Sequence, residues 1–448
     1  MLAITFLICT QLSSSFPVPL VLPTGHGAQY KADHATVAIN SNLDIAVAYH
    51  ARTSSAILKQ VEVAYYKRNN STDSWSYVST SVVGSTIHDS LNLGSTPKCE
   101  RPDIVSVGEY FFVTWTRRYE DYPTPTSSNH PAALECAFLK YENSAVSVIN
   151  GNNPPGLGYQ IDAHGLNGND FYVKECAGVV DAFVIDDTNT THRLGVVYPH
   201  QTNFVDSTRK FDLRIASVSI NSVTDTLSRA VPSCLINNIR FEGSTGGSVG
   251  LILPDAVRGN ISNEFWLTHE LQIHDSSNNT TQGKIRIAYI KKNLAGGEWS
   301  PMATHVFGTS NLSILRRPML SNHSDHPANV SIAFSSGPNG QDVDYQQWSV
   351  VNDNLVGVIP TSGHQFNNST AIDERPIPFH SFGYRRCYFS RNGNIIYYDL
   401  DTDQETILHS STDASRPAVA IGRQGINDYI VNTWEEGSPK RIWINIEN

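Results

Sequence analysis

An internal repeat is the strongest indication of the fold, because an Arg-Pro pair opens an apolar run at four places in the chain. After the first and the last pair, a turn leads to a second apolar run, which ends at Trp115 or Trp434 close to charged residues. Repetition of one supersecondary unit is typical of propellers and other repeat architectures. The four pairs are Arg101-Pro102, Arg317-Pro318, Arg375-Pro376 and Arg416-Pro417.

Weaker copies of the same unit raise the number of repeats to seven, which start near residues 34, 101, 176, 254, 317, 375 and 416. Most units continue into a third run of alternating, β-branched and aromatic residues. That is the pattern of β-strands, and no segment keeps a helical period. The sequence therefore predicts an all-β fold, a seven-bladed β-propeller that forms a single domain over residues 16–448.

The last repeat suggests how the ring closes. It reaches the C-terminus after only three predicted strands, although a propeller blade normally has four. We therefore expect residues 19–22, Pro-Leu-Val-Leu, to supply a strand from the N-terminal side. Closure of this kind removes the exposed edge that an open array of sheets would leave.

Residues 1–15 resemble a secretory signal peptide, because an apolar run from Met1 is followed by three serines. The run contains no Lys or Arg, and an N-terminal strand is the alternative. Glycosylation acceptor patterns agree with export, although a chain rich in Asn, Ser and Thr produces some of them by chance. We expect a secreted, extracellular glycoprotein with acceptor patterns at Asn70, Asn189, Asn260, Asn279, Asn311, Asn322, Asn329 and Asn368.

Charge and cysteine spacing argue against several classes of partner and cofactor. The 448 residues carry a formal net charge of −10, which gives no sign of nucleic acid as a partner. No later segment approaches the length of a transmembrane helix. The six cysteines include no Cys-x-x-Cys pair, so zinc and redox motifs are unsupported. Cys99 and Cys136 are expected on one face of blade two, as a disulfide or as separate buried thiols.

Propeller geometry turns the repeat into a site prediction. The start of each inner strand and the end of each second strand lie at the same mouth of the central channel. Arginine binds carboxylate and sulfate groups with two parallel hydrogen bonds, so arginines at this mouth would bind an anionic carbohydrate. We expect a substrate-binding set of Arg101, Arg117, Arg118, Arg317, Arg375 and Arg416, and a catalytic set of His50, His200, His269, Glu270 and Glu435.

A structural role is the alternative for these residues. An arginine that recurs in four units could bond neighbouring loop carbonyls blade after blade. Aromatic residues at the strand ends are expected to fill the packing between blades rather than to stack on sugars. Because Gln404 stands where a calcium loop needs glycine, a solvated turn is favoured at the nearby acids. A structural calcium ion is the weaker alternative at Asp399, Asp401 and Asp403, and no other cofactor is expected.

Two turns, at residues 71–75 and 296–299, look like degraded Asp-boxes, whose usual pattern is Ser-x-Asp-x-Gly-x-Thr-Trp. Together with the Arg-Pro strand starts and the Val-x-Trp second strands, they give a chain that resembles the sialidase-like (BNR-repeat) β-propellers from about residue 30 onward. That superfamily includes sialidases, other glycoside hydrolases, polysaccharide lyases and non-catalytic lectins, so the resemblance implies a fold more than a reaction. Sialidases bind the substrate carboxylate with an arginine triad that begins at Arg-Ile-Pro, whereas this chain begins its first unit with His34.

Two functions of different class remain open. The first is an enzyme that binds an anionic polysaccharide at the arginine-rich face. As a lyase, it would use an arginine to neutralise the carboxylate and His50, His200 or His269 to take the proton. As a glycoside hydrolase, it would use Glu270 and Glu435 as its two carboxyl groups. The second function is a non-catalytic module that binds a glycan or docks a protein in an extracellular assembly.

Overall fold

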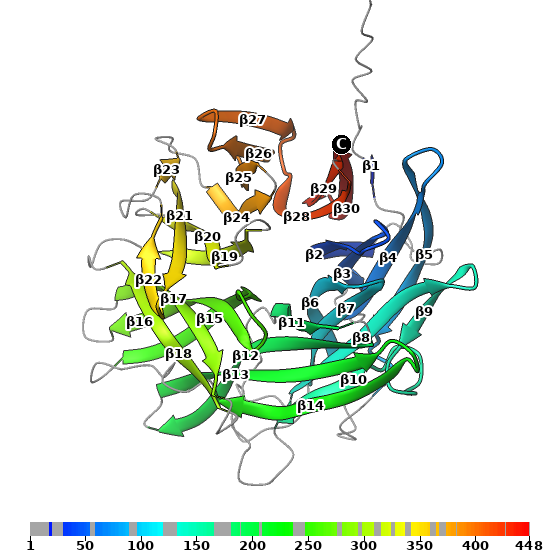
Figure 1. The fold of residues 1–448 in the computed structure, drawn as a ribbon, viewed down its shortest axis with the longest axis horizontal. Coiled ribbons are helices and arrows are strands. Elements are labelled where there is room, and N and C mark those ends of the chain that lie inside the picture. The colour runs from blue at the N-terminus through cyan, green and yellow to red at the C-terminus, as the bar shows by residue number, and fades with distance from the viewer. Residues whose placement is uncertain are drawn as a thin grey trace, which may run out of the picture.

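The computed structural model describes residues 18–19, 30–53, 59–88, 96–119, 132–164, 181–188, 190–205, 208–235, 247–275, 280–293, 298–308, 315–323, 328–336, 342–358, 364–366, 373–381, 383–425 and 427–447. Within these residues every helix or strand is a β-strand, and none of them forms a helix that could span a membrane. The strands make seven antiparallel sheets around a central opening (Figure 1). The predicted all-β class and the seven blades are therefore confirmed.

In the first four blades the chain starts at the centre of the ring and moves outward strand by strand (Figure 1). Blade one consists of β2 (Tyr30–Ile39), β3 (Ile45–Thr53), β4 (Lys59–Asn69) and β5 (Ser74–Gly84). Blade two consists of β6 (Lys98–Val107), β7 (Tyr110–Arg118), β8 (Ala132–Glu142), β9 (Ala145–Ile149) and β10 (Tyr159–His164). Blade three consists of β11 (Asp181–Asp187), β12 (Thr191–Val205), β13 (Thr208–Asn221) and β14 (Thr226–Leu235). Blade four consists of β15 (Gly247–Arg258), β16 (Glu264–Asp275), β17 (Thr280–Lys292) and β18 (Trp299–Phe307).

The remaining blades repeat this order, and the last of them also includes a strand from the start of the chain. Blade five consists of β19 (Arg316–Asn322), β20 (Asn329–Ser336), β21 (Asp342–Val351), β22 (Asn354–Gly357) and β23 (His364–Phe366). Blade six consists of β24 (Asp373–Ser381), β25 (Tyr384–Arg391), β26 (Asn394–Asp399) and β27 (Gln404–His409). Blade seven consists of β28 (Ser415–Gln424), β29 (Asn427–Glu436), β30 (Arg441–Glu447) and β1 (Val18–Pro19).

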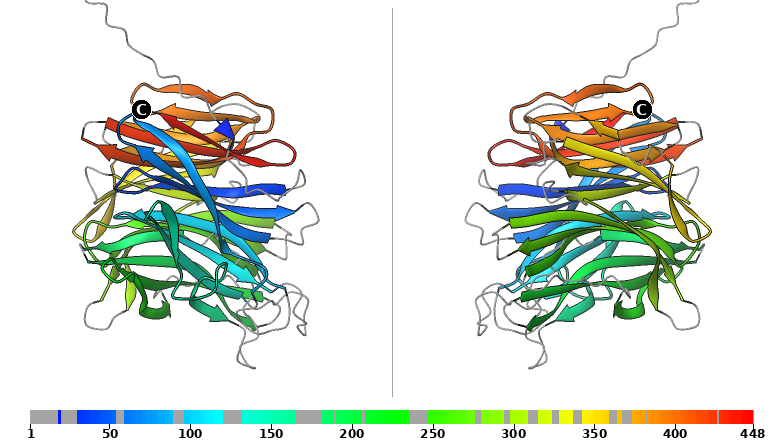
Figure 2. Two further views of the ribbon diagram at one scale, coloured as in Figure 1. Left: turned by 90° about the vertical axis from the view of Figure 1, so that its right-hand side faces the viewer. Right: turned by 90° about the vertical axis from the view of Figure 1, so that its left-hand side faces the viewer.

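The short strand β1 pairs antiparallel with β30, so that Val18 faces Ile444 and Pro19 faces Trp443. This pairing places β1 at the outer edge of blade seven, next to the C-terminal strand. Closure of the ring by residues 19–22 stays a prediction, because residues 20–22 lie outside the described part of the chain. Residues 1–15, the expected signal peptide, also lie outside it. From the side, the strands of neighbouring blades lie above one another and run in one general direction (Figure 2).

The Arg-Pro pairs occupy β-bulges near the starts of the inner strands. In β6, for example, the pairing with β7 shifts between Glu100 and Asp103, and Arg101 and Pro102 lie in the shift. A bulged residue is left out of the hydrogen-bond ladder, so a proline without an N–H is tolerated there. Equivalent shifts occur in β2, β15, β19, β24 and β28. The Arg-Pro signature is therefore the sequence signal of the bulge.

The first residue of the bulge has a left-handed backbone in five blades. Its φ lies between 51° and 55° at His34, Arg101, Arg317, Arg375 and Arg416. A non-glycine residue in this conformation costs about 1 kcal/mol. Proteins keep such strain mostly where a side chain must be aimed at a site. Five strained residues at equivalent positions therefore make the mouth of the ring a candidate functional site.

Buried aromatic side chains face the bulges and fill the space between blades. Trp115 lies opposite the bulge of β6, and Trp434 lies opposite that of β28. Both are fully buried, as are Tyr49, Tyr198 and Trp266. The apolar clusters each join neighbouring blades; one of them packs Val47 of blade one against Val431 of blade seven. The predicted role of the strand-end aromatics in packing, rather than in sugar stacking, is confirmed.

The inner strands enclose a cavity of about 440 Å³ in the centre of the ring. Its wall includes the residue that follows each of the bulges named above. The left-handed residues precede these wall residues in the inner strands, so they lie at one end of the channel. Asn322, which carries an acceptor pattern for glycosylation, also lines this wall. The wall residues that follow the bulges are Thr36, Asp103, Asp255, Met319, Ile377 and Ala418.

Candidate functional site

The mouth of the channel carries one histidine and four arginines on strained backbone, and we call this set the rim. Each rim side chain is partly buried, so it is held by the protein and still reaches solvent. The rim concentrates positive charge on a chain whose net charge is −10. Such an arrangement attracts anions to a concave surface. The rim consists of His34, Arg101, Arg317, Arg375 and Arg416.

The best-defined part of the rim lies where blades six, seven and one meet. Nη1 of Arg416 lies 3.2 Å from both ring nitrogens of His34. The charge of Arg375 also acts on His34. Because β24, β28 and β2 belong to consecutive blades, residues far apart in the chain form one positively charged corner (Figure 1). A ligand at this corner would contact three blades.

Asp33 fixes the orientation of two histidines at this corner. Its Oδ1 accepts a hydrogen bond from Nδ1 of His34 at 3.0 Å and another from Nδ1 of His50 at 3.0 Å. Its Oδ2 is paired with Nη2 of Arg52 at 2.6 Å. Although burial by itself would raise the pKa of Asp33, the hydrogen bonds from both histidines hold that pKa well below its ordinary value. Asp33 is therefore a carboxylate that only accepts hydrogen bonds.

His34 is kept neutral at physiological pH. Burial lowers its pKa from the ordinary value of 6.5, and the charges of Arg416 and Arg375 lower it further, while Asp33 opposes the shift. Since Nδ1 donates its proton to Asp33, Nε2 carries the lone pair. His34 has a side-chain exposure of 27%, against 6% for His50. Of the two histidines, His34 is the one that reaches the channel mouth.

Asp33, His34 and His50 are also the one cluster in the described residues whose spacing suits a metal ion, with ligand atoms within 4.8 Å of one another. The surroundings oppose a dication. Arg52 already neutralises Asp33, and Arg416 lies against His34. A divalent cation would be repelled by these arginines. The corner suits an anionic ligand better than a metal.

The two candidate acids for hydrolysis have structural contacts. Oε1 of Glu435 accepts hydrogen bonds from the backbone N–H of His34 at 2.7 Å and from Arg416 at 3.2 Å. Oε1 of Glu270 accepts one from the backbone N–H of Arg317 at 2.5 Å. Both glutamates are buried. Each glutamate thus holds the strained bulge of the next blade in place, and neither presents a free carboxyl group to the channel.

The structure places Arg117 in the interior rather than at the mouth. Its guanidinium donates to both oxygens of Glu135, at 2.6 and 3.0 Å, and Nη1 donates to the carbonyl oxygens of Ser85 and His88. The side chain is 0% exposed. The neighbouring Arg118 is 17% exposed and lies 3.5 Å from Glu100. Arg117 therefore has a structural role, which was the alternative to substrate binding. Arg118 lies beside the rim.

Of the other candidate histidines, one is fully buried and the other lies outside the described side chains. His269 is fully buried, and its Nδ1 donates to the carbonyl oxygen of Glu270 at 3.1 Å. Burial lowers the pKa of His269 to about 3, and Arg286 adds to the shift. In that environment His269 is a neutral interior residue rather than a proton carrier. His200 pairs with Asp212 in the backbone ladder between β12 and β13, and its side chain is not among those the structure describes.

The cysteines and the acidic turn are also structural. Cys99 and Cys136 are both buried and free, so the expected pair is two separate thiols. Asp399, Asp401 and Asp403 lie at the hairpin between β26 and β27. Asp399 accepts backbone hydrogen bonds from Asp401 and Thr402, Asp401 accepts from Arg385, and Asp403 accepts from Tyr398. These contacts are those of a solvated turn, which the sequence favoured over a calcium loop.

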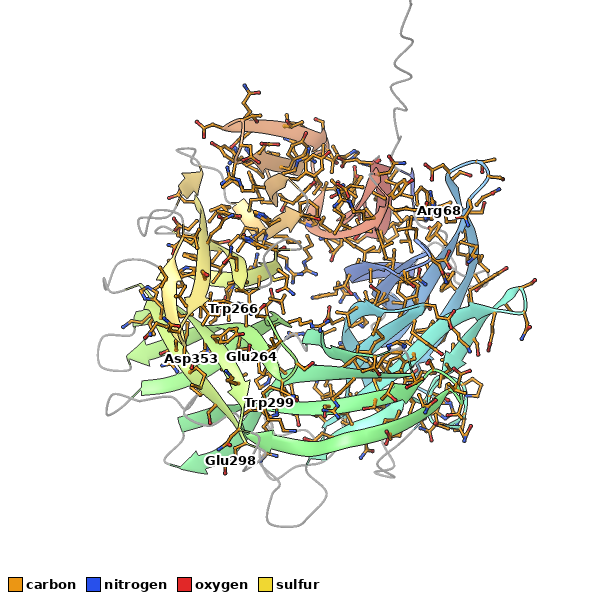
Figure 3. The ribbon with its side chains drawn as sticks, in the orientation of Figure 1. Arg68, Glu264, Trp266, Glu298, Trp299 and Asp353 are labelled. Carbon is orange, nitrogen blue, oxygen red and sulfur yellow. The ribbon has the colours of Figure 1, made fainter. Side chains whose placement is uncertain are left out.

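The degraded Asp-box turn of blade one lies at the opposite end of the sheet from the bulge, because β2 to β5 are antiparallel. Nη2 of Arg68 donates to Asp73 at 2.5 Å and to the hydroxyl of Tyr429 at 2.9 Å, so it ties blade one to blade seven. At the second such turn, Trp299 packs on Phe265 with ring centroids 5.2 Å apart. Figure 3 labels Arg68 and Trp299 on their two blades. The turn of blade one is structural, as predicted, whereas residues 296 and 297 of the second turn lie outside the described part of the chain.

The repeat pattern in the sequence indicates the arginines of the rim but not its central residues. His34 appeared only as the degenerate start of the first unit, and Asp33 and Arg52 were not noticed. A signal was present, because His34 occupies the position that arginine holds in four other units. Alignment of the repeats could have marked His34 as a rim residue. The contact of Asp33 with His50 depends on strand register, which the repeat alone does not give.

The left-handed bulge gives a prediction about stability. Arg101→Gly is expected to be more stable than Arg101→Ala by about 0.5–1 kcal/mol, because only glycine adopts this backbone without strain. Chemical denaturation of both variants measures the difference. The matched pair is Ser106→Gly and Ser106→Ala in the regular part of β6, where glycine should be the less stable of the two. Equal stability of the two Arg101 variants would contradict a strained bulge.

No protein-family model matches the chain, and no match was found among curated proteins. Among solved structures, a protein of unknown function from Dyadobacter fermentans matches with 9% identity and a TM-score of 0.43, over 94% of this chain and 95% of that one. A Trypanosoma rangeli sialidase in complex with the inhibitor DANA matches with 10% identity and a TM-score of 0.42, over 96% of this chain and 57% of the sialidase. Bacillus subtilis levansucrase matches with 10% identity and a TM-score of 0.39, over 77% and 89% of the two chains.

The chain spans little more than half of the sialidase's length. At identities near 10% and TM-scores from 0.39 to 0.43, these matches carry no argument about the function of this chain. The roles of the rim residues are therefore argued from their own geometry.

Proposed function

We propose that this propeller binds an extracellular glycan that carries carboxylate or sulfate groups, and that it does so at the rim. The observation that carries the proposal is the corner where Arg416 lies 3.2 Å from His34 and Arg375 acts on the same histidine. One guanidinium group and a neutral imidazole meet there at a partly exposed mouth, and the charge of a second guanidinium group acts on the same imidazole. This combination suits a planar anion that also offers hydroxyl groups.

The strain at the rim supports a ligand-binding role over a purely structural one. If the arginines served only to bond loops of their own blades, a relaxed backbone would serve as well. Instead, five equivalent residues keep a left-handed backbone, and buried glutamates hold two of these bulges by their N–H groups. The strain is thus fixed by contacts from the preceding blade. Such over-determined strain is typical of residues that must be aimed precisely at a ligand.

A glycan array with the purified protein tests the proposal. Binding should be confined to glycans that carry uronate, sialate or sulfate groups. The Arg101→Ala/Arg416→Ala double variant should bind at least about 100-fold more weakly, since each charge-assisted hydrogen bond contributes about 1.5–3 kcal/mol. The matched control is Arg385→Ala/Arg423→Ala, which removes the same charge from the ends of blades six and seven that lie opposite the bulges. The control should bind like the original protein.

Two outcomes would contradict the proposal. Binding that falls equally in the control would mean that net charge, not the rim, attracts the glycan. Absence of binding to every anionic glycan would leave the alternative, a propeller that docks a protein in an extracellular assembly. Circular dichroism of each variant separates lost binding from lost folding.

A further inference from the structure

A polar pocket lies on the face of the ring opposite the rim, where blade one meets blade seven. Its volume is about 300 Å³, at the lower end of the range of small-molecule sites. The turn between β2 and β3, the end of β4 and the last residue of β28 form it, at the ends of these strands away from the bulges. Its polar lining consists of Ser41, Asn42, Lys67, Arg68, Asn70 and Gln424.

Arg68, labelled in Figure 3, fixes the orientation of an amide in this pocket. Its side chain is buried, and Nε and Nη2 donate to Oδ1 of Asp73 at 3.0 and 2.5 Å. Nη1 donates to Oε1 of Gln424 at 2.5 Å and lies 3.5 Å from Oδ1 of Asn70. Because the amide oxygen of Gln424 is turned to the guanidinium, this side chain offers its amide nitrogen, a hydrogen-bond donor, to the pocket. Asn70 has the same orientation through the longer contact.

The two cations of the lining have acidic partners that do not line the pocket. Nζ of Lys67 donates to Oδ2 of Asp44 at 2.9 Å, which uses one of the three donors of an ammonium group. Lys67 is partly exposed, whereas Asp44 is buried. Asp44 also accepts hydrogen bonds from the hydroxyl of Tyr65 and the backbone N–H of Arg68. The pocket therefore presents positive charge and N–H donors, while the compensating carboxylates are engaged outside its lining.

The turn between β2 and β3 is held in one conformation. Leu43 has a left-handed φ of 61°, which a bulky side chain rarely adopts. Its carbonyl oxygen accepts a hydrogen bond from Nε1 of Trp75 at 2.7 Å. The backbone N–H of Ser41 donates to the carbonyl oxygen of Gly108, in blade two, at 2.9 Å. A wall that is fixed in this way loses little conformational entropy when a ligand binds.

We propose that this pocket binds a phosphate group, either as free phosphate or as part of a small phosphomonoester. A phosphomonoester carries a charge of about −1.5 to −2 near pH 7 and three acceptor oxygens. Nζ of Lys67, Nε2 of Gln424 and Nδ2 of Asn70 supply donors for these oxygens, and charged partners strengthen such hydrogen bonds. Because the pocket lies at the other end of the strands from the rim, binding there is independent of the proposed glycan binding.

Isothermal titration calorimetry with inorganic phosphate, methyl phosphate and methyl sulfate tests this proposal. Protein from a host that does not glycosylate asparagine keeps Asn70 unmodified, and added chloride holds the ionic strength constant. Methyl phosphate should bind at least about 10-fold more tightly than methyl sulfate, which has a similar shape and a smaller charge. Tighter binding of inorganic phosphate would identify the free ion as the ligand, and tighter binding of methyl phosphate would identify an ester. Either result supports a phosphate site.

The variant Gln424→Glu tests the orientation of the amide. Glutamate keeps an acceptor for Arg68 and replaces the amide donor by a negative charge, so phosphate should bind about 10- to 100-fold more weakly. The matched control is Gln404→Glu, which adds the same charge at an exposed position on the same face of blade six. The control should bind phosphate within a few-fold of the original protein. Equal weakening in both variants would overturn the pocket as the site.

The rim variant separates this pocket from the proposed glycan site. Arg101→Ala/Arg416→Ala should bind phosphate like the original protein, and Gln424→Glu should bind anionic glycans like the original protein. Phosphate binding that is lost in the rim variant and kept in Gln424→Glu would place the anion at the rim and overturn the pocket. Equal binding of methyl phosphate and methyl sulfate, or no binding of either phosphate at millimolar concentration, would overturn the phosphate assignment. Both results would leave the glycan proposal standing.

Discussion

Replacing Arg117 by methionine is expected to lower the free energy of unfolding by about 3–5 kcal/mol, the usual cost of leaving one partner of a buried ion pair alone. Arg117 and Glu135 are both 0% exposed and meet at 2.6 Å. The same guanidinium also satisfies carbonyl oxygens from Ser85, His88 and Gly156. Methionine would leave a buried carboxylate and these carbonyls without their donor. The loss should be among the largest from any single substitution in blade two.

Urea denaturation of Arg117→Met measures this effect, with Arg118→Met as the matched control. Arg118 is adjacent in sequence and partly exposed, and its distance to Glu100 is 3.5 Å. Loss of a pair of this kind should cost about 1 kcal/mol or less. The double variant Arg117→Met/Glu135→Leu should recover part of the loss, because it removes the stranded charge. Equal effects at positions 117 and 118 would contradict the interior role of Arg117.

The second large effect is a loss of stability in acid that depends on His269. Burial lowers the pKa of this histidine in the folded protein from 6.5 to about 3. Between these two pH values the unfolded chain binds a proton at His269 and the folded chain does not. The contribution of the neutral imidazole to the free energy of unfolding is therefore complete above pH 6.5 and is lost as the pH falls toward 3. At pH 5, roughly 1.5 units below the pKa of the unfolded chain, this effect lowers the free energy of unfolding by about 2 kcal/mol.

Denaturation at pH 7.5 and at pH 5 measures this contribution in the original protein and in His269→Gln. Glutamine keeps an N–H donor for the carbonyl oxygen of Glu270 and does not titrate. The variant should lose about 2 kcal/mol less than the original protein between the two pH values. His88→Gln is the control, since His88 lies at the surface and bonds the carbonyl oxygen of Pro155. An unchanged pH dependence in His269→Gln would mean that this imidazole is not kept neutral by burial.

The repeat in the sequence was enough to predict the blades. Each unit carries its own strands and turns, so local alternation and turn residues specify it without knowledge of the neighbouring blades. The Arg-Pro pairs coincide with four bulges that were not predicted from the sequence, because a proline within a strand is tolerated where the ladder is already broken. Aromatic residues such as Trp115 and Trp434 were assigned to the core for the same reason, since they recur at the ends of the second strands.

The function of individual charged residues was not predictable in this way. Arg117 and Arg118 are adjacent in β7, yet their side chains leave the strand on opposite faces, so one is buried and the other is partly exposed. The register that decides between them depends on packing against blade one. Glu435 looked like a catalytic acid at a strand end. Its partner, the backbone N–H of His34, lies 401 positions away in the chain.

The all-β class, the number of blades and the recurring arginines therefore follow from the order of amino acids alone, because these features repeat and each unit specifies them locally. Which charged side chains face the channel, and which form ion pairs or hydrogen bonds inside the protein, depends on how the blades pack together. The corner of Asp33, His34, Arg375 and Arg416 exists because the last blades lie beside the first. Contacts across that junction join distant parts of the chain, and no local pattern encodes them.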